Sequence, residues 1–492
     1  MANKKLLIQF FILSLVPAAL IYFLKSPDFP LDDSYIVQHS VAGLLGLGEI
    51  RFHESTPLQG ATSPAHIMLI LVTSYFTGIP WAQFLMATLY FFLYIFAIYK
   101  LCHKNRVEEF WTYLIIFISV VAGFSFYHLF NGLETGLAMA AVLWVLYIFD
   151  PPESTTPQKH HFLLLGALPF IRPELAAFSL LFLLSLCISS KSCVNRHQIL
   201  TAALWSCLGT VPFLAFLHFF NGPLIPNTLN AKIFFFAEGC GPLKSKLDFV
   251  ASAITGWVSS QGIAALGFAG IFFYKRKVVV LAFIAIFIFF YLIKFPGALH
   301  HNWYRYLYLL FPFILLGWIQ LLTIHGRMKL VVKLLLLMSV FHTAINSDKA
   351  IRYYVDAISF TRNELAPIAE WAAHHLTSQD VVLIHDAGYI STIGKAKLID
   401  LVGLKTPSSV DVHKRYTWEL CGRNIKALDV IATKNQANYF IVLDGWDQIF
   451  GLTASLRLSG WKLDLLATRA NGYGAYKIYR LNKPNKGTNI IN

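Results

Sequence analysis

Apolar runs of about twenty residues recur along the first two thirds of this 492-residue chain, and they limit its possible folds more than any other feature. A helix of that length crosses a hydrocarbon core about 30 Å thick. Backbone N–H and C=O groups find no partner in lipid, so each lipid-exposed run must be helical. The chain is 56% hydrophobic and 13% charged, which is consistent with burial in lipid. We therefore expect a polytopic α-helical membrane domain.

The first run, residues 6–24, follows two lysines and lacks a small-residue cleavage site, so we expect a retained helix with its N-terminus inside. The run 64–78 is short for a crossing, and we expect a juxtamembrane or re-entrant helix there. The remaining candidate spans are 81–99, 111–128, 133–149, 162–171, 174–190, 198–220, 248–273, 278–295, 303–324 and 329–345.

Short clusters of Lys and Arg between the runs predict the orientation, because such clusters stay on the cytoplasmic side. All of them fall inside if 64–78 does not cross, which gives eleven crossings. The net charge of +14 is then an orientation signal, and we expect no nucleic-acid binding. The clusters are Lys100/Lys104/Arg106, Lys159, Lys191/Arg196, Lys275/Arg276/Lys277 and Arg327/Lys329.

With this topology, the outer face carries long segments and the inner face carries short basic loops. Most acidic residues of the membrane half fall on the outer face, so we expect the functional site there. The outer segments are 25–80, 128–134, 172–174, 221–247, 296–303 and the chain after about residue 346.

After residue 346 the composition changes to mixed, amphipathic sequence, which predicts a separate soluble domain. Alternation of predicted strands and helices favours a small α/β fold. We divide the chain into a polytopic domain, residues 1–345, and an extracytoplasmic α/β domain, residues 346–492. The expected elements are helices at 359–376 and 424–435 and strands near 380–385, 397–402, 439–443, 461–467 and 474–480.

Two adjacent carboxylates, Asp32 and Asp33, follow the first apolar run. Either of them could be a solvated loop acid or a helix cap. However, they lie in an outer loop that returns through Thr62-Ser63-Pro64 onto an apolar juxtamembrane helix. This setting suits a general base close to a lipid substrate.

An ordered series of motifs resembles the membrane-embedded glycosyltransferases of the GT-C superfamily. The similarity is closest to the bacterial branch that includes arabinofuranosyltransferases, with aminoarabinose transferases and protein O-mannosyltransferases as more distant relatives. The motifs are Asp32-Asp33-Ser34-Tyr35-Ile36, Gly48-Glu49 with Phe52, Gly60-Ala61-Thr62-Ser63-Pro64, Asn131-Gly132-Leu133-Glu134-Thr135, Arg172-Pro173-Glu174, the stretch from Pro226 to Lys232, Trp303-Tyr304-Arg305-Tyr306, Asp386-Ala387-Gly388 and the stretch from Ile399 to Leu404.

The resemblance implies transfer of a sugar from a polyprenyl-phosphate donor to an acceptor on the outer face. An acidic residue of the first outer loop then takes the proton of the acceptor hydroxyl, and Asp33 and Asp32 remain equal candidates. Glu134, at the start of an apolar helix, either orients the acceptor, shares a divalent ion with Asp33 or simply favours the helix dipole. We leave the metal and any other cofactor unassigned.

The donor phosphate needs cations as it becomes the leaving group. The outward-facing candidates are Arg172, Lys232, Arg305, His300 and His301, together with Tyr304 of the same aromatic belt as Arg305. Each cation could instead be a snorkelling interfacial side chain. Glu174 and Arg172 flank the break at Pro173, where they line the site or pair with each other.

Two of the six cysteines, Cys240 and Cys421, fall on the outer face. Because that compartment is oxidising, they could form a disulfide between the loop 221–247 and the soluble domain; two free thiols remain the alternative.

We thus expect a glycosyltransferase of the bacterial inner membrane with an envelope glycan or lipid acceptor. The alternatives are a polytopic transporter or lipid flippase, and a non-catalytic envelope-assembly protein. A transporter should show two related halves and charges in mid-span, which the sequence lacks.

Overall fold

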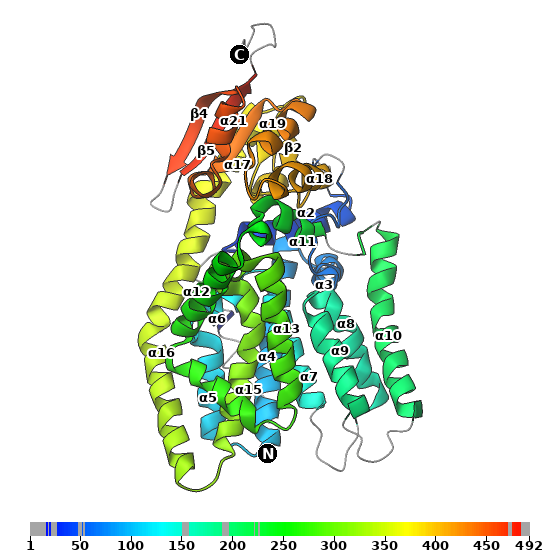
Figure 1. The fold of residues 1–492 in the computed structure, drawn as a ribbon, viewed down its shortest axis with the longest axis vertical. Helices are drawn as coiled ribbons and strands as arrows, with labels where there is room; N and C mark the ends of the chain where they lie inside the picture. Colours follow the sequence, from blue (N-terminus) through cyan, green and yellow to red (C-terminus); the bar gives the residue numbers. More distant parts are fainter. Residues whose placement is uncertain are drawn as a thin grey trace.

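The computed structural model describes residues 16–17, 19–20, 27–47, 52, 55–149, 157–188, 196–220, 222–224, 227–470 and 475–483. A bundle of helices carries an α/β domain on one end (Figure 1). The predicted span 6–24 lies almost wholly outside the described residues, as do Gly48, Glu49 and Pro226.

Apolar helices form the bundle, as the hydropathy predicts. Among the described residues, six helical stretches are long and apolar enough to cross a membrane, and shorter apolar helices accompany them, so the chain is an integral membrane protein. The bundle contains α2 (Asp32–Leu44), α3 (Pro64–Ser74), α4 (Ile79–Lys104), α5 (Glu109–Val121), α6 (Ser125–Phe130), α7 (Thr135–Ile148), α8 (Phe162–Ile171), α9 (Leu175–Ile188), α10 (Arg196–Phe219), α11 (Asn227–Phe236), α12 (Leu243–Gln261), α13 (Lys277–Lys294), α14 (His301–Tyr304), α15 (Phe311–Leu322) and α16 (Arg327–Phe360).

Three of the predicted runs are not continuous α-helices. The run 303–324 begins with the positive-φ residues Trp303 and Tyr304 and contains a 3₁₀-helix, Arg305–Leu310, before α15. The run 111–128 breaks between α5 and α6, where Gly123 has φ +57°. A side chain at Gly123 would meet both Gln261 and Tyr308, so a glycine is needed there for space as well as for its backbone. The run 248–273 changes from α12 to a 3₁₀-helix at Gly262, which also has a positive φ. Hydropathy alone does not register such breaks, because the residues on both sides stay apolar.

The last predicted run, 329–345, belongs to a longer helix. α16 continues through residue 346 to Phe360 and leads through a π-helical turn, Thr361–Leu365, into α17 (Ala366–His375). The α/β domain therefore sits directly on the end of a helix from the bundle (Figure 1).

The C-terminal domain is built on a mixed five-stranded sheet with the order β2-β1-β3-β5-β4. β2, β1 and β3 are parallel, and β5 and β4 continue antiparallel. The strands lie where the alternation of the sequence places them, and the helices α18, α20 and α21 are additional. The elements are β1 (Val381–Ile384), β2 (Lys397–Asp400), α18 (Pro407–His413), α19 (Ile425–Lys434), β3 (Tyr439–Leu443), α20 (Asp444–Phe450), α21 (Leu452–Leu458), β4 (Lys462–Ala470) and β5 (Ala475–Asn482).

The two halves share a hydrophobic interface. Ile36 of α2 and Phe235 of α11 belong to the same buried cluster as the sheet residues. Phe52 of the first loop forms a parallel bridge with Leu398, so this loop adds to the free edge of β2. Burial of large apolar side chains contributes roughly 1.5–3 kcal/mol each, which favours a fixed position of the domain on α2 and α11.

Candidate functional site

The two aspartates lie in the first turn of α2, where carboxylates interact favourably with the helix dipole. Leu31, in extended conformation, precedes the helix. Successive residues of a helix point in directions about 100° apart, so the two side chains face different surroundings.

Asp32 points to the C-terminal domain. Its Oδ2 accepts a hydrogen bond of 2.8 Å from the Gly388 N–H, and its Oδ1 accepts one of 2.7 Å from the Tyr389 N–H. Burial and the negative charge of Asp386 raise the pKa of Asp32 well above its usual range, although the two amide hydrogen bonds oppose this. A Cβ at Gly388 would fall 2.0 Å from the Asp32 carbonyl oxygen, so this position needs glycine. Asp32 therefore acts as an anchor between α2 and the turn that follows β1.

Asp33 points into the bundle. Its Oδ2 accepts a hydrogen bond of 2.9 Å from Arg305 Nη1, and Lys232 adds a second positive charge nearby. Burial raises the pKa of Asp33, but these two cations and the hydrogen bond outweigh it, so the pKa lies below its usual value. The Asp33 side chain is 29% exposed and that of Arg305 is 7% exposed, so the carboxylate is the accessible member of the pair.

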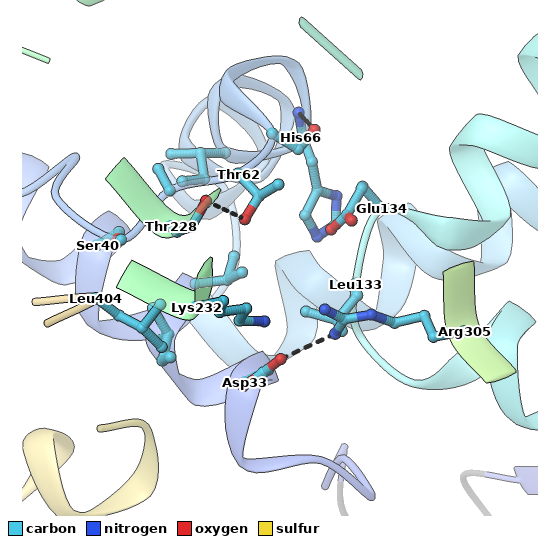
Figure 2. Close-up of a pocket in the computed structure, with 16 residues that line it drawn as sticks. Asp33, Ser40, Thr62, His66, Leu133, Glu134, Thr228, Lys232, Arg305 and Leu404 are labelled. Carbon is cyan, nitrogen blue, oxygen red and sulfur yellow. Dashed lines mark hydrogen bonds and ion pairs between the residues drawn. The ribbon is translucent and has the colours of Figure 1, made fainter. Parts of the chain in front are cut away.

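A polar cavity of about 40 Å³ opens beside Asp33 (Figure 2). Side chains from five separate segments converge on it: α2, the turn before α3, the start of α7, α11 and the stretch that begins at Arg305. Leu404 adds a wall from the C-terminal domain. The lining residues are Asp33, Ile36, Val37, Ser40, Gly60, Ala61, Thr62, Ser63, His66, Ile67, Leu133, Glu134, Thr228, Lys232, Arg305 and Leu404.

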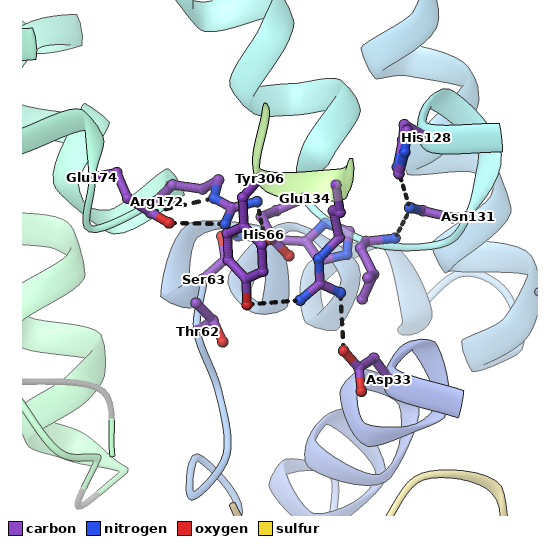
Figure 3. Close-up of polar contacts among 12 residues, drawn as sticks. Asp33, Thr62, Ser63, His66, His128, Asn131, Glu134, Arg172, Glu174 and Tyr306 are labelled. Carbon is purple, nitrogen blue, oxygen red and sulfur yellow. Dashed lines mark hydrogen bonds and ion pairs between the residues drawn. The ribbon is translucent and has the colours of Figure 1, made fainter. Parts of the chain in front are cut away.

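Two guanidinium groups lie over the ring of Tyr306, beside this cavity (Figure 3). The Cζ atoms of Arg172 and Arg305 lie 4.9 and 5.2 Å from its ring centroid. Its hydroxyl accepts hydrogen bonds of 3.4 Å from Arg305 Nη2 and from Lys232 Nζ. Tyr306 thus holds three cations within one cluster.

Two carboxylates neutralise the positive charge of Arg172, which is fully buried. Its Nη1 lies 3.4 Å from Glu134, and its Nη2 and Nε donate to Glu174 at 3.0 and 3.3 Å. The Tyr291 hydroxyl donates to the same Glu174 at 2.5 Å. Because a buried charge requires partners, Glu134 and Glu174 account for Arg172, which leaves Arg305 and Lys232 as the cations next to Asp33.

The backbone in front of Arg305 is unusual. Asn302, Trp303 and Tyr304 have φ values of 48°, 59° and 64°, which L-residues adopt at a cost of about 1–3 kcal/mol each. His128 Nε2 lies 3.0 Å from the Trp303 carbonyl oxygen and helps to hold this segment. The left-handed turn places Arg305 and Tyr306 toward the cavity.

A larger apolar groove of about 350 Å³ adjoins the polar cavity, and the two share Thr62, Thr228 and Lys232. Thr62 Oγ1 donates to Thr228 Oγ1 at 3.3 Å where they meet. The rest of the groove is mainly apolar and aromatic: Pro173, Glu174, Ala176, Ala177, Leu229, Phe283, Ile286, Phe287, Phe290, Tyr291, Phe295 and Tyr306. A charged head and an apolar chain could therefore bind side by side.

The C-terminal domain contacts α2 a second time through Lys405. Its Nζ donates to Ser40 Oγ at 2.8 Å, and the side chain is fully buried. Burial lowers the pKa of Lys405 to about 7, although the nearby Asp400 opposes this. With Asp32 at the first turn and Ser40 two turns later, the domain holds α2 at two points.

The other predicted site residues lie near the cavity but do not line it. His300 lies beside Ser252 and the Phe249 carbonyl on α12, at 3.0 and 3.1 Å. His301 packs between the rings of Phe236 and Trp446, and Tyr304 points to Gly256 of α12. Residues from the prediction that do line a cavity are Asp33, Glu134, Glu174, Lys232 and Arg305.

The structure joins Cys240 and Cys421 in a disulfide, with their Cα atoms 5.5 Å apart. It links the segment after α11 to the C-terminal domain. Mass spectrometry of the protein under non-reducing conditions tests the bond, and recovery of both cysteines as free thiols would rule it out.

Sequence reasoning did not single out Tyr306, His66 or Lys405. His66 Nδ1 lies 3.0 Å from the Tyr90 hydroxyl and Nε2 3.1 Å from the Gly132 carbonyl oxygen, so it supports the cavity wall. Tyr306 belongs to the same sequence motif as Tyr304. The two side chains point in different directions because of the left-handed turn before Arg305, which the motif does not reveal. Among the described residues, no group of three His, Cys, Asp or Glu side chains has the arrangement of a metal site.

Comparison with known proteins shows the fold. A family model for a domain of unknown function, DUF8728, matches residues 351–479, and no curated protein matches the chain. ArnT from Cupriavidus metallidurans bound to undecaprenyl phosphate is similar over 96% of this chain and 98% of its own, with 13% identity and a TM-score of 0.54. The match to ArnT from the same organism in the apo state covers 98% of this chain and 98% of ArnT, with 12% identity and a TM-score of 0.53. The chain therefore has an ArnT-like fold over nearly its full length.

Proposed function

We propose that this protein transfers a sugar from a polyprenyl-phosphate donor to a hydroxyl of an envelope glycan or lipid. One observation carries the proposal: Asp33, an accessible carboxylate, faces Arg305 and Lys232 in a polar cavity that adjoins an apolar groove. The ArnT-like fold supports it, because one of the similar structures contains undecaprenyl phosphate. The order of the sequence motifs also resembles GT-C glycosyltransferases.

The groove binds the polyprenyl chain of the donor, and the cavity binds its polar head. The polyprenyl chain lies along the aromatic groove between α9, α11 and α13, and the phosphate lies at the junction, next to Lys232. Arg305 reaches the same point from the other side of Tyr306. Charge-assisted hydrogen bonds to a phosphate are about twice as strong as neutral ones, so the two cations fix the donor head.

The acceptor hydroxyl reacts on the side of Asp33. Asp33 takes the hydroxyl proton while the acceptor oxygen forms a bond to the anomeric carbon. The bond from that carbon to the phosphate oxygen breaks, and polyprenyl phosphate leaves with the electron pair. Arg305 and Lys232 stabilise the charge that develops on the leaving phosphate. Attack from the opposite face inverts the anomeric carbon.

The Asp33–Arg305 ion pair makes the base depend on the donor. A carboxylate held by two cations is a weak base, because its pKa is low. A donor phosphate competes for the same cations and weakens their hold on Asp33. Donor binding thereby raises the basicity of Asp33 when the substrate is in place.

The proposal includes the topology. With eleven crossings and the basic loops inside, α2, the cavity and the C-terminal domain lie on the outer face of a bacterial inner membrane. The division at residues 345 and 346 and the role of Glu134 in orienting the acceptor belong to the same proposal. A reporter fused after about residue 350 tests the topology, and activity only in the cytoplasm would contradict it.

The test of the function is the variant Asp33→Asn with Asp32→Asn as its matched neighbour. Asp33→Asn should lower transfer from extracted polyprenyl-phosphate sugar by about 10²–10⁴-fold, because the amide cannot accept the proton. It should still bind undecaprenyl phosphate, since Lys232 and Arg305 remain. Size-exclusion chromatography checks that both variants are folded. Transfer by Asp33→Asn at the wild-type rate would exclude Asp33 as the base, and donor binding without transfer by the wild type would favour a lipid carrier.

A further inference from the structure

A second cavity, of about 140 Å³, lies between the α5–α6 turn, α12 and α16. None of its lining residues lines the catalytic cavity or the groove. In Figure 1, α12 and α16 lie on one side of the bundle, and α9 and α10 lie on the other. The lining residues are Val121, Gly123, Phe124, Ser259, Ser260, Gln261, His342, Thr343, Asn346, Lys349, Ala350 and Tyr353.

Two deeply buried polar side chains on its wall have atoms without a hydrogen-bond partner. Gln261 is 1% exposed and Thr343 is 3% exposed, and both Gln261 Oε1 and Thr343 Oγ1 lack a partner among the described residues. The Gln261 amide nitrogen donates to the Tyr308 hydroxyl at 2.9 Å, which orients the side chain. An unpaired buried polar atom costs roughly 1–3 kcal/mol, so a polar ligand at this place would be favourable.

The position of the cavity along α16 fits the headgroup region of a membrane. At a rise of 1.5 Å per residue, Thr343 lies about 24 Å and Lys349 about 33 Å from Arg327 at the basic end of the helix. A hydrocarbon core is about 30 Å thick. The cavity therefore extends from inside the bilayer to its interface, where lipid phosphate and glycerol groups reside.

The charge of the lining favours an anion. Lys349 is exposed and His342 is partly exposed, and no carboxylate lines the cavity. The neighbouring Asp348 is directed to Arg352, with which it forms an ion pair of 2.8 Å. The Thr343 hydroxyl is the group that can donate to a phosphate oxygen, because Ser260 already donates to the Trp257 carbonyl and Asn346 to the His342 carbonyl.

We propose that this cavity binds the anionic phosphate headgroup of a membrane lipid other than the donor. Its wall is connected to the catalytic residues: the rings of Phe124, Trp303 and Tyr353 pack on one another at centroid distances of 4.6–5.4 Å. Trp303 belongs to the left-handed turn that precedes Arg305. A lipid in this cavity thus contacts Phe124 and Tyr353, and these two rings pack on Trp303 of the segment that precedes Arg305.

Binding of dioctanoyl phosphatidylglycerol to the purified full-length chain tests the proposal. Lys349→Ala should weaken binding roughly five- to tenfold, since a basic residue near lipid phosphate contributes about 1 kcal/mol or more. Lys244→Ala, an exposed lysine in the first turn of α12 outside the cavity, is the matched control and should bind as the wild type does. Equal binding by Lys349→Ala and the wild type would overturn the proposal.

Three further comparisons separate the possible sources of the signal. Thr343→Val keeps the shape of the side chain but removes the hydroxyl, so binding should weaken while the melting temperature stays within a few degrees. Lys232→Ala should bind the short lipid as the wild type does, although it loses undecaprenyl phosphate, so this test is independent of the catalytic proposal. Equal affinity for inorganic phosphate or for dioctanoyl phosphatidylcholine would show that no anionic lipid is selected and would overturn the proposal.

Discussion

The first turn of α2 contacts two regions that shift the pKa of a carboxylate in opposite directions. At the C-terminal domain, two backbone amides hold Asp32, and burial with the nearby Asp386 raises its pKa. At the polar cavity, Arg305 and Lys232 hold Asp33 and lower its pKa. The comparison teaches that adjacent acids need not share a role. One anchors the helix, and the other faces the cations of the proposed reaction.

After Asp33→Asn, the largest expected effect comes from removing the cation that distinguishes the two surroundings. Arg305→Gln should lower the transfer rate by about 10²–10³-fold, because the leaving phosphate loses a charged donor. The variant also raises the pKa of Asp33, since one positive charge next to the carboxylate is lost. A base acts above its pKa, so the acid limb of the pH–rate profile should move to higher pH.

The pH–rate profile provides the control for this variant. In the wild type without donor, Asp33 has a lowered pKa, so kcat/KM, which reports the free enzyme, should not fall with pH until the medium is strongly acidic. A profile of Arg305→Gln that falls in rate without any movement of the acid limb would contradict the coupling between Arg305 and Asp33.

A smaller effect is expected at the domain interface. Asp32→Asn keeps one oxygen acceptor but replaces the other with an N–H donor, which cannot bond the second amide. We expect kcat to fall roughly tenfold, as a charge-assisted hydrogen bond contributes about 1.5–3 kcal/mol. The KM for the donor should stay the same, because Lys232 and Arg305 are unchanged.

The exposed ion pair between Asp28 and Arg362 supplies a matched comparison for Asp32. It also joins the segment before α2 to the π-helical turn after α16, at 2.5 Å, but it lies outside α2. Asp28→Asn should therefore change kcat by less than about twofold, as exposed ion pairs contribute little. If Asp28→Asn and Asp32→Asn reduce kcat equally, the anchor on α2 has no special part in the reaction.

The sequence predicted the bundle and the sheet because both depend on local patterns. Hydropathy finds helices such as α8 and α13, and apolar runs rich in β-branched residues find strands such as β1 and β3. The topology also placed Asp33, Lys232 and Arg305 on one face. Their direct contact lay beyond the sequence, since Asp33 and Arg305 are separated by 272 residues.

The choice between Asp32 and Asp33 required tertiary structure. The Gly388 amide that anchors Asp32 lies 356 residues away, and no local pattern of Asp-Asp reveals which side chain faces it. In the same way, Tyr304 and Tyr306 are equivalent in the motif. The left-handed backbone from Asn302 to Tyr304 turns one of them to α12 and the other to the cavity, and none of its three residues is a glycine that would have indicated the turn.

The smallest effect tests the second contact of the C-terminal domain with α2. The pKa of Lys405 is about 7 in the folded protein, below its usual value of 10.5, because of burial. The unfolded chain therefore binds more protons than the folded chain between pH 7 and 10.5, and this residue makes the free energy of unfolding rise with pH, by up to about 1.4 kcal/mol per pH unit. Lys405→Met removes the titrating group, so thermal or denaturant unfolding at several pH values should show a shallower rise of the free energy of unfolding with pH than in the wild type.

The loss of the hydrogen bond between Lys405 and Ser40 should lower kcat only a few fold, because Asp32 still holds the first turn of α2. An unchanged pH dependence of unfolding would mean that Lys405 is not buried against α2, and the C-terminal domain would then hold the helix through Asp32 alone.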